Sequence, residues 1–180
     1  MAIDRRIVKT KEAIKNAFVE LMSEKNFDQI TIQDITDRAN IGRRTFYSHY
    51  LDKYDLLDKF TEEHINELEK ICAWSSDLDF IDANVIWFEY LENNYSFFST
   101  LLKSKGAPYF RSRFLEFVIK ELKDEVNVNE GKNQGLNKDV IIQFLGVAIV
   151  GIVESYFTNE LNEPSRVVAE QVGILLERNL

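Results

Sequence analysis

The sequence predicts an all-α protein of about nine helices. The 180-residue chain contains only 2 prolines and 7 glycines, and its hydrophobic residues, 45% of the total, recur every three or four positions. This period is typical of amphipathic helices, and the composition is that of a folded chain rather than of a linker or tail. A substantial core is expected, since a chain of about 150 residues already removes roughly 70% of its unfolded surface from water.

The first predicted helix covers residues 5–24. Its apolar positions Ile7, Ile14, Phe18 and Leu21 fall on one helical face, and the lysines of the same segment lie largely elsewhere. This helix should therefore bury one stripe of side chains and expose the rest.

The second predicted helix starts after Thr31, a suitable N-cap, and ends at about Ala39. Asp34, three residues after the cap, completes a pattern like a capping box. Ile30 before the cap and Ile35 at the fourth helical position predict a hydrophobic staple across the helix start.

A turn of three residues, 40–42, separates this helix from a third at about 43–50. Gly42 serves either as a residue of permissive turn conformation or as the N-cap of the third helix. Two short helices joined by such a turn have the spacing of a helix-turn-helix unit, whose second helix enters the major groove of DNA.

The fourth predicted helix repeats the start signals of the second and extends from about residue 53 to residue 72 or 74. Asp52 is the expected N-cap with Asp55 three residues on, and Leu51 and Leu56 form the expected staple. The remaining predicted helices lie at about 80–103, in one or two pieces, 107–126, 138–158 and 164–180, with loops at 75–77, 127–137 and 159–163.

The predicted third helix has two distinct faces. Phe46 and Tyr50 are four residues apart and should pack on Ile35 and the first helix. The opposite face carries Arg43, Arg44, Tyr47 and Ser48, with Thr45 and His49 at its flanks. An arginine fork can read guanine O6 and N7, and hydroxyls can contact phosphates or bases. From the spacing alone, a solvated surface helix is an equally good interpretation, because helical hairpins are common in all-α proteins.

The formal net charge of −8 is unevenly distributed along the chain. Residues 1–51 carry nine Lys and Arg against seven Asp and Glu, a net of +2, so the other 129 residues carry −10. Phosphate binding draws on clustered basic residues. A weakly basic head on an acidic body therefore favours a nucleic-acid-facing N-terminal end, although this signal is weak by itself.

A resemblance to a known family rests on residues 30–57, which read ITIQDITDRANIGRRTFYSHYLDKYDLL. This segment resembles the N-terminal domain of the TetR/AcrR family of bacterial transcriptional regulators, through the turn entry Ala-Asn-Ile and the ordered string TFYxHYxDKxxLL. The preceding helix extends the resemblance to about residues 5–57. The charge-rich run and the late Gly-containing loop are similar to the Firmicute subgroup that includes the dihydroxyacetone kinase regulators.

The resemblance implies a helix-turn-helix DNA-binding domain at 1–52 and a helical ligand-binding and dimerisation domain at 53–180. Together with the faces of the third helix, it predicts DNA contacts by Thr31, Gln33, Arg43, Arg44, Thr45, Tyr47, Ser48, His49 and Lys53. Lys53 and the start of the second helix are expected to bind phosphate, which helix N-termini favour. The family often has a small residue where this chain has Arg44, so no operator sequence can be borrowed.

The resemblance further implies a dimeric repressor that a small-molecule effector releases from a palindromic double-stranded operator. The alternative is a helix-turn-helix co-regulator controlled by a protein partner and without a small-molecule pocket. A body cavity below roughly 300 Å³ would favour that alternative, since drug-sized ligands usually need more.

In the family, the last two helices of two subunits form the dimer interface. Here residues 140–153 are apolar almost all round, and Gly146, Ala148 and Gly151 permit close helix approach. We therefore expect a homodimer through the last two helices; the alternative is a core helix buried within one subunit.

The middle helices are rich in aromatic residues. Ordinary core packing is the commoner reason for such a pattern, but a pocket among them is the natural effector site. Trp87, Tyr90 and Phe117 are the candidate ligand-binding residues.

Catalytic motifs and Gly-rich phosphate loops do not stand out, so we expect no enzyme, no catalytic residues and no cofactor. We also expect no metal site, because His64, Glu67 and Cys72 share a predicted helix but a zinc ligand set would be incomplete with two histidines in the chain. The single cysteine, the absence of an apolar leader and a longest apolar run of 14 residues predict a cytoplasmic protein without a membrane partner.

Overall fold

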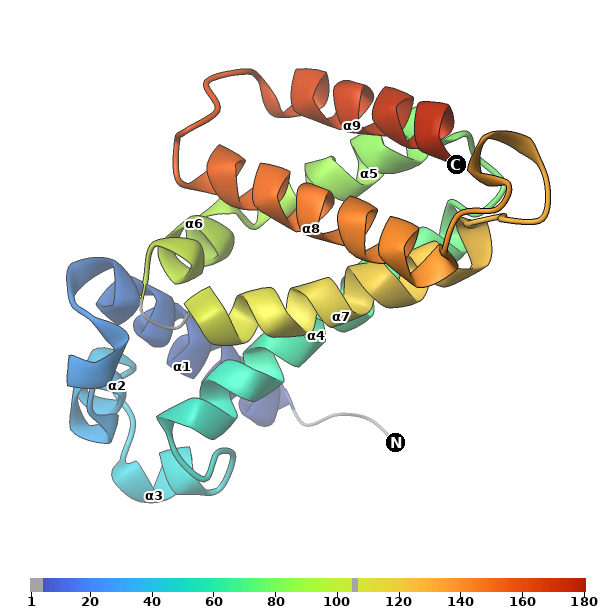
Figure 1. The fold of residues 1–180 in the computed structure, drawn as a ribbon. Helices are drawn as coiled ribbons and strands as arrows, with labels where there is room; N and C mark the ends of the chain where they lie inside the picture. Colours follow the sequence, from blue (N-terminus) through green and yellow to red (C-terminus); the bar gives the residue numbers. More distant parts are fainter. Residues whose placement is uncertain (1–4, 105–106) are drawn as a thin grey trace.

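The structure is a computed structural model that describes residues 5–104 and 107–180. Within these ranges it contains nine α-helices, two short 3₁₀ turns and no strand, as Figure 1 shows. The predicted all-α fold is confirmed. Residues 1–4 of the predicted N-terminal domain lie outside the described residues.

The helix bounds agree closely with those predicted, apart from the C-terminal end of the third helix. Segment 80–103 forms two helices, which is one of its two predicted alternatives. The helices are α1 (Arg5–Glu24), α2 (Ile32–Arg38), α3 (Arg43–Tyr47), α4 (Lys53–Trp74), α5 (Phe80–Asn93), α6 (Tyr95–Lys103), α7 (Ala107–Glu125), α8 (Lys138–Phe157) and α9 (Ser165–Asn179). The 3₁₀ turns are Phe27–Gln29 and Gly131–Asn133.

The first three helices form a head at one end of the molecule, with α3 at its tip, and the later helices form an elongated body (Figure 1). Helix α4 leaves the head and runs into the body, where it packs against α5 and α7. Helix α8 covers α7, and α9 lies along α5. Helix α6 contacts α1, so the head and the body also meet at that point.

The predicted helix starts are confirmed where a polar cap was expected. Thr31 accepts a hydrogen bond from the Asp34 backbone N–H, and the Asp34 carboxylate accepts one from the Thr31 N–H, which completes a capping box. Asp52 accepts hydrogen bonds from the N–H groups of Tyr54 and Asp55. These local contacts satisfy backbone donors that a helix start otherwise leaves without partners.

Two predicted apolar contacts are wrong. Leu51 is 78% exposed, while Leu56 is completely buried, so the two side chains form no staple across the start of α4. Ile7 is 42% exposed, although Ile14 and Phe18 on the same helix are completely buried. Both exposed residues lie at the edge of the core. The helical period shows which face of a helix is apolar, but it does not show how far along the helix its neighbours cover that face.

The core is rich in aromatic rings that connect successive helices of the body. The rings of Phe98 on α6, Phe110 and Phe114 on α7 and Phe157 on α8 are all at most 1% exposed. Phe98 lies with its centroid 5.7 Å from that of Phe110 and 5.6 Å from that of Phe157. Most of the aromatic residues of the middle helices are therefore ordinary core, as the commoner interpretation predicted.

Gly173 sets the closest helix contact of the body, between α9 and α5. A Cβ atom at this position would lie 2.5 Å from Ile81 Cα and 2.7 Å from the Phe80 carbonyl oxygen. Gly146 has a similar role between α8 and α7, where a Cβ would meet the side chains of Ile119 and Leu115 at 3.2 and 3.3 Å. A side chain at Gly173 would force the backbones of α9 and α5 apart.

Helix α8 is long and apolar enough, by length and composition, to cross a membrane. The core helices of water-soluble proteins meet the same criteria, and α8 here buries one face against α7.

Candidate DNA interface and effector cavity

Helix α3 is fixed to the head by two buried rings. Phe46 is completely buried, Tyr50 is 2% exposed, and their centroids lie 5.6 Å apart. The predicted inward face of the third helix is therefore confirmed. The helix itself ends at Tyr47 rather than near residue 50, because the hydrogen bond of the His49 N–H goes to the Phe46 carbonyl, in a tighter 3₁₀ turn.

The turn before α3 sets the angle between the two helices of the helix-turn-helix unit. Asn40 has a φ of +52°, and the Ile41 N–H donates to the Thr36 carbonyl, which is the Schellman pattern at the end of a helix. Gly42 has a φ of −76° and is the N-cap of α3. The left-handed conformation therefore belongs to Asn40, and Gly42 takes the second of its two predicted roles.

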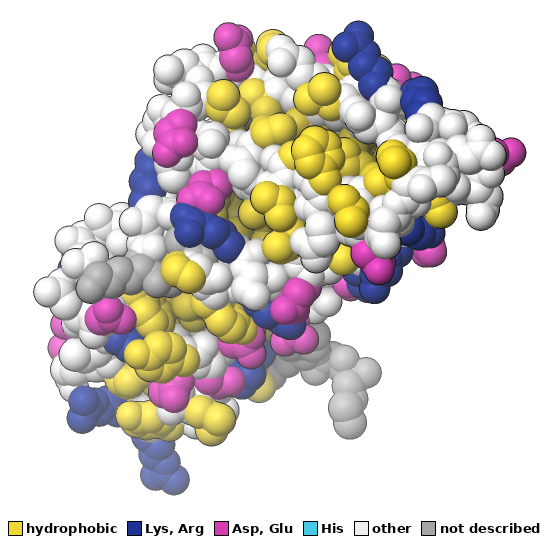
Figure 2. Space-filling view, in the orientation of Figure 1, with side chains coloured by type: hydrophobic (Ala, Val, Ile, Leu, Met, Phe, Trp, Pro, Cys, Tyr) yellow, Lys and Arg dark blue, Asp and Glu magenta, His cyan; other side chains and the backbone are white. Residues whose placement is uncertain are grey.

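The outward face of α3 carries two arginines that have no ion-pair or hydrogen-bond partner in the part of the chain that the structure describes. Arg43 and Arg44 are exposed, and Tyr47 beside them is 54% exposed. Dark blue side chains project from this end of the molecule in Figure 2. Thr45 and Ser48 are also exposed, and His49 is half-buried. The arrangement leaves two guanidinium groups and a phenol free to meet a ligand outside the molecule.

The two residues predicted to bind phosphate at the start of α2 are already engaged within the head. The Thr31 hydroxyl donates to the Asp34 carboxylate at 2.7 Å, and the Gln33 amide donates to Asp37. Lys25 lies 2.8 Å from the Asp34 carboxylate, and together with Thr31 it holds the pKa of that carboxyl far below its usual range. The predicted phosphate contacts stay predictions, and they would require these side chains to exchange partners.

Lys53 at the start of α4 points into the head. Its ammonium donates to the carbonyls of Phe27, Asp28 and Ile30, each at 2.9 Å. The same nitrogen lies 4.8 Å from the ring centroid of Phe27. All three ammonium protons are used, so the predicted phosphate contact of Lys53 requires at least one of these hydrogen bonds to break.

The body contains an open cavity of about 650 Å³ between α4, α5, α7 and α9, with Ile149 of α8 at its edge. Trp87 and Phe117, two of the three candidate ligand-binding residues, line it, and their ring planes are within 15° of parallel with centroids 6.5 Å apart. The other described lining residues are apolar side chains, six carboxylates, one lysine, and a few uncharged polar side chains such as Ser75 and Asn84. A cavity of this size can take a drug-sized molecule.

Tyr90, the third candidate, does not line this cavity. Its hydroxyl lies 2.7 Å from Nδ1 of His64 on α4. The His64 ring stacks on Phe97 with centroids 4.2 Å apart, and Nε2 of the ring is buried without a hydrogen-bond partner in the described ranges. Burial, and then the positive charge of Lys15, lower the pKa of His64 to about 4, so the ring is neutral in the folded protein at pH 7.

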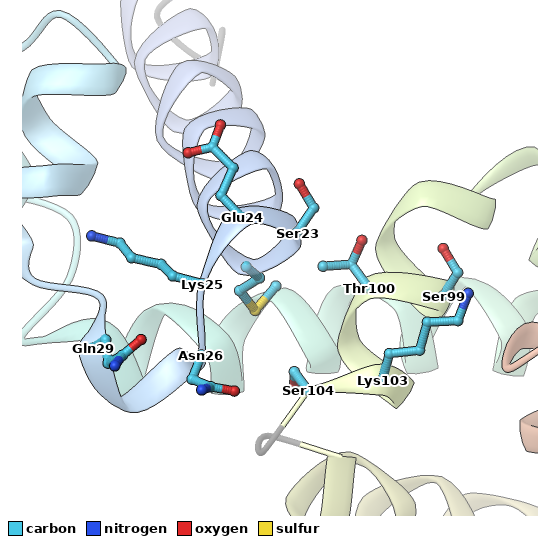
Figure 3. A pocket seen from close by; sticks show the side chains of 10 residues that line it. Ser23, Glu24, Lys25, Asn26, Gln29, Ser99, Thr100, Lys103 and Ser104 are labelled. Carbon is cyan, nitrogen blue, oxygen red and sulfur yellow. The ribbon is translucent and has the colours of Figure 1, made fainter.

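A second hollow, of about 570 Å³, lies where the head meets the body. Figure 3 shows hydroxyl, amide and charged side chains from the end of α1, the following turn and α6 around it. Its lining is mostly polar, with Met22 the one apolar side chain among the described residues that line it. This hollow lies at the junction of head and body, and it lacks the apolar walls expected of an effector site.

The sequence did not reveal the carboxylates of the cavity. Glu121 and Asp124 on α7 and Glu177 on α9 line it together, but each resembled an ordinary solvated residue of an amphipathic helix. The sequence shows only that the body has an excess of acidic residues, and this excess does not tell which of them line a cavity. In the described ranges no group of three His, Cys, Asp or Glu side chains is placed to hold a metal ion.

Two family models match the chain. The model of the bacterial regulatory proteins of the tetR family covers residues 14–60, and a model of transcriptional regulator C-terminal regions, TetR_C_8, covers residues 79–178. The first match contains the helix-turn-helix unit, and the second contains most of the body.

Individual relatives agree with the family models. The chain is 23% identical over 178 residues to the activator of the dhaKLM operon, DhaS, of Lactococcus lactis, a match that covers 96% of this chain and 91% of that protein. It is 45% identical to the uncharacterised regulator YxbF of Bacillus subtilis, but over 67 residues, which are 37% of this chain and 18% of that protein. Among solved structures, a TetR regulator from Streptococcus agalactiae is 30% identical, with a TM-score of 0.70 and 96% of both chains covered.

We expect Lys53→Met to destabilise the protein by about 1 to 3 kcal/mol, because three carbonyls lose a charged donor while the apolar stem of the side chain is kept. Chemical unfolding of the variant and of the unaltered protein measures this difference. Lys59→Met is the matched control: Lys59 also lies on α4, is exposed and pairs with Asp55 at 2.9 Å, so its loss should change stability by about 0.5 kcal/mol or less.

The salt dependence of DNA binding separates the two roles of Lys53. If Lys53→Met leaves the unfolding free energy unchanged and lowers the salt slope of DNA binding by about 1, the Lys53 ammonium binds a DNA phosphate. That result would refute its role in holding the three carbonyls of the head.

We also expect the folded protein to become less stable as the pH is lowered, because His64 is neutral in the folded state and protonated in the unfolded chain. Since the folded pKa lies below the unfolded value of 6.5, the unfolded chain binds the proton first as the pH falls below about 6.5. Between pH 7.5 and 5.5 this removes about 1 kcal/mol of stability. Unfolding at both pH values should show a smaller loss in His64→Asn, which cannot take up the proton. Equal losses in the variant and the unaltered protein would contradict the assignment.

Proposed function

The chain belongs to the TetR family of bacterial transcriptional regulators, and from this premise we propose that it is a homodimeric repressor, released from a palindromic operator by a small organic effector. The proteins of this family bind DNA operators and act as dimers. The family and the fold are those of transcriptional regulators, which in general are not enzymes. The proposal adds the sign of regulation, the residues that read the operator and the means of release.

One observation carries the DNA-binding proposal: two arginines that have no partner among the described residues lie on the exposed face of a helix whose opposite face is locked by Phe46 and Tyr50. Arg43 and Arg44 can each donate two hydrogen bonds to O6 and N7 of a guanine in the major groove. Tyr47 can reach a phosphate or a thymine methyl group. Thr45, Ser48 and His49 are the proposed backbone contacts at the flanks of α3.

We place the boundary between the DNA-binding domain, 1–52, and the effector and dimerisation domain, 53–180, at the start of α4. This helix of 22 residues spans about 33 Å at 1.5 Å per residue. Its first turn holds the head through the Lys53 ammonium, and its last turn lines the cavity through Cys72 and Ala73. A change at the cavity therefore has a continuous helical path to α3.

The proposed dimer uses the apolar stripe of α8. Val140, Phe144 and Val147 are 65%, 68% and 56% exposed, and Ala148 and Gly151 continue the same face. A Cβ at Gly151 would meet nothing within 4 Å in its own subunit. Hydrophobic side chains gather over α8 in Figure 2. An apolar face of this kind, left open by the subunit, supports a helix-to-helix interface with a second copy.

The cavity volume bears on the alternative of control by a protein partner. At about 650 Å³ the cavity is well above the roughly 300 Å³ that a drug-sized ligand needs, which supports an effector. The printed name of the relative DhaS describes an operon activator, so activation is the second candidate for the sign of regulation. A reporter gene placed behind the bound operator separates the two: deletion of the regulator raises expression under repression and lowers it under activation.

We expect Arg43→Ala and Arg44→Ala each to weaken binding to the operator by about fivefold to 150-fold, since a bidentate contact to guanine is worth about 1 to 3 kcal/mol. The operator is first selected from random DNA with the unaltered protein, and affinities are then measured by fluorescence anisotropy. The control is Arg113→Ala on α7, whose guanidinium pairs with Glu116 at 3.4 Å. Unchanged affinity in the two α3 variants, with the fold intact by circular dichroism, would refute the assignment.

We expect the unaltered chain to sediment as a dimer at micromolar concentration and Phe144→Glu to sediment as a folded monomer, because a buried, unpaired carboxylate would disrupt the interface. Leu51→Glu introduces the same charge at another exposed apolar residue, in the head, and should leave the dimer unchanged. A monomeric unaltered chain at this concentration would overturn the dimer.

A further inference from the structure

We propose that the cavity between α4, α5, α7 and α9 binds an organic cation with an apolar body, and that its positive head lies against the carboxylates at the ends of α7 and α9. This inference deepens the proposed function and rests on it, because it names the chemical class of the effector.

The first argument is the charge of the lining. Six carboxylate residues and one basic residue line the cavity: Glu69, Asp79, Glu121, Asp124, Glu125, Glu177 and Lys120. Lys120 donates to Glu69 at 2.7 Å, and the carboxylate of Asp79 caps α5 by accepting a hydrogen bond from the Asp82 N–H. The remaining four carboxylates lie on α7 and α9, and no ion-pair partner of theirs is found within residues 5–104 and 107–180. An anionic head group would be repelled here, and a cation would be attracted.

The second argument is the orientation of the helices around the mouth. Helix α4 ends at Trp74, α7 at Glu125 and α9 at Asn179, and the cavity is lined by residues from the last turn of each or directly after it. The C-terminal end of a helix carries a partial negative charge. Three such ends add to the field of the carboxylates. The N-terminal end of α5 also lines the cavity and opposes part of this field, and the Asp79 carboxylate caps that end. Lys132, outside the lining, donates to the Glu177 carbonyl and offsets part of the field of α9.

The third argument is Glu121, which lies deepest among the carboxylates without an ion-pair partner. It is half-buried, and loss of hydration raises its pKa above the usual range. The Cys72 thiol is hydrogen-bonded to it, and burial together with this carboxylate raises the thiol pKa to about 12. Cys72 is therefore a neutral thiol and no nucleophile. A partly desolvated carboxylate beside a neutral donor gains from a cation that replaces the lost water.

The fourth argument is the apolar part of the lining, which lies largely on the same helices as the carboxylates. Trp87 and Phe117 contribute aromatic rings, and Val118, Leu122 and Leu176 contribute aliphatic surface. Apolar walls next to carboxylates match a molecule with a hydrophobic body and a positive end. A small hydrated cation would leave the apolar walls in water, and a hydrocarbon without charge would leave the carboxylates without partners.

The test uses Trp87 as the reporter of binding. The chain has two tryptophans, and Trp74 is 73% exposed outside the lining, so Trp74→Phe removes the background signal. The probes are decyltrimethylammonium, decanoate, tetramethylammonium and spermidine, all used below micelle-forming concentrations. We expect saturable quenching by decyltrimethylammonium, at least about tenfold tighter than by the other three, since each lacks either the positive head or the apolar body.

Variants then locate the head group. Glu121→Gln should weaken binding of decyltrimethylammonium by about fivefold, the effect of a partly exposed charge pair. Glu116→Gln, on the same helix but outside the lining, should leave it unchanged. Should Glu121→Gln fail to fold, Asp124→Asn tests the same field from the exposed end. Equal or tighter binding of decanoate overturns the cationic class, equal binding of spermidine overturns the apolar body, and equal effects of Glu121→Gln and Glu116→Gln overturn the site.

A separate measurement distinguishes failure of this inference from failure of the proposed function. The probe that binds is added to the complex with the selected operator, and anisotropy reports release. Binding of the cation without release of DNA supports the ligand class and refutes the proposed means of regulation. Release by decanoate and not by the cation supports effector control and refutes the ligand class.

Discussion

The head and the body share one helix, and the ammonium of Lys53 fixes how that helix begins. Its three hydrogen bonds reach the carbonyls of residues 27, 28 and 30, which connect α1 to α2. The connection, the start of α4 and the preceding α3 therefore move together. Because the ammonium donates to three carbonyls of the connection between α1 and α2, a single side chain fixes the start of α4 to that connection. The position of α3 relative to the body then depends on the direction of α4.

Several of the basic residues of the head are used in ion pairs between helices, so the net charge of the head does not show which cations can meet DNA. Lys15 pairs with Glu63, Lys25 with Asp34, and Arg38 with Glu20 and Glu24. These pairs hold helices to one another and contribute little net field outside. Arg43 and Arg44 remain available at the tip of α3. The net of +2 for residues 1–51 also includes the four basic residues of the first half of α1, so the sum by itself does not locate the charge that can meet DNA. The acidic body opposes loose binding to DNA elsewhere on the surface.

Local features were predictable from the sequence because their causes are local. The caps at Thr31 and Asp52 and the inward pair of Phe46 and Tyr50 depend on residues within four positions of each other. The exposure of Leu51, the inward direction of the Lys53 ammonium and the separation of Tyr90 from Trp87 depend on which distant segments lie nearby. The cavity and its carboxylates could not be predicted from the sequence for the same reason, since the helix ends that carry them meet only in the folded body.

The close contacts around the cavity indicate which wall can move. Gly173 leaves no space between α9 and α5, where an added Cβ would lie 2.5 Å from the backbone. Gly146 brings α8 against the side chains of Leu115 and Ile119 on α7. Two walls of the cavity are therefore held by pairs of closely packed helices, and packed helices resist small displacements. Helix α4 contains no glycine and contacts α5 and α7 through its side chains. We therefore propose α4 as the wall through which an effector acts, because it is the one helix of the described ranges that both lines the cavity and holds the connection before α2 through its first turn.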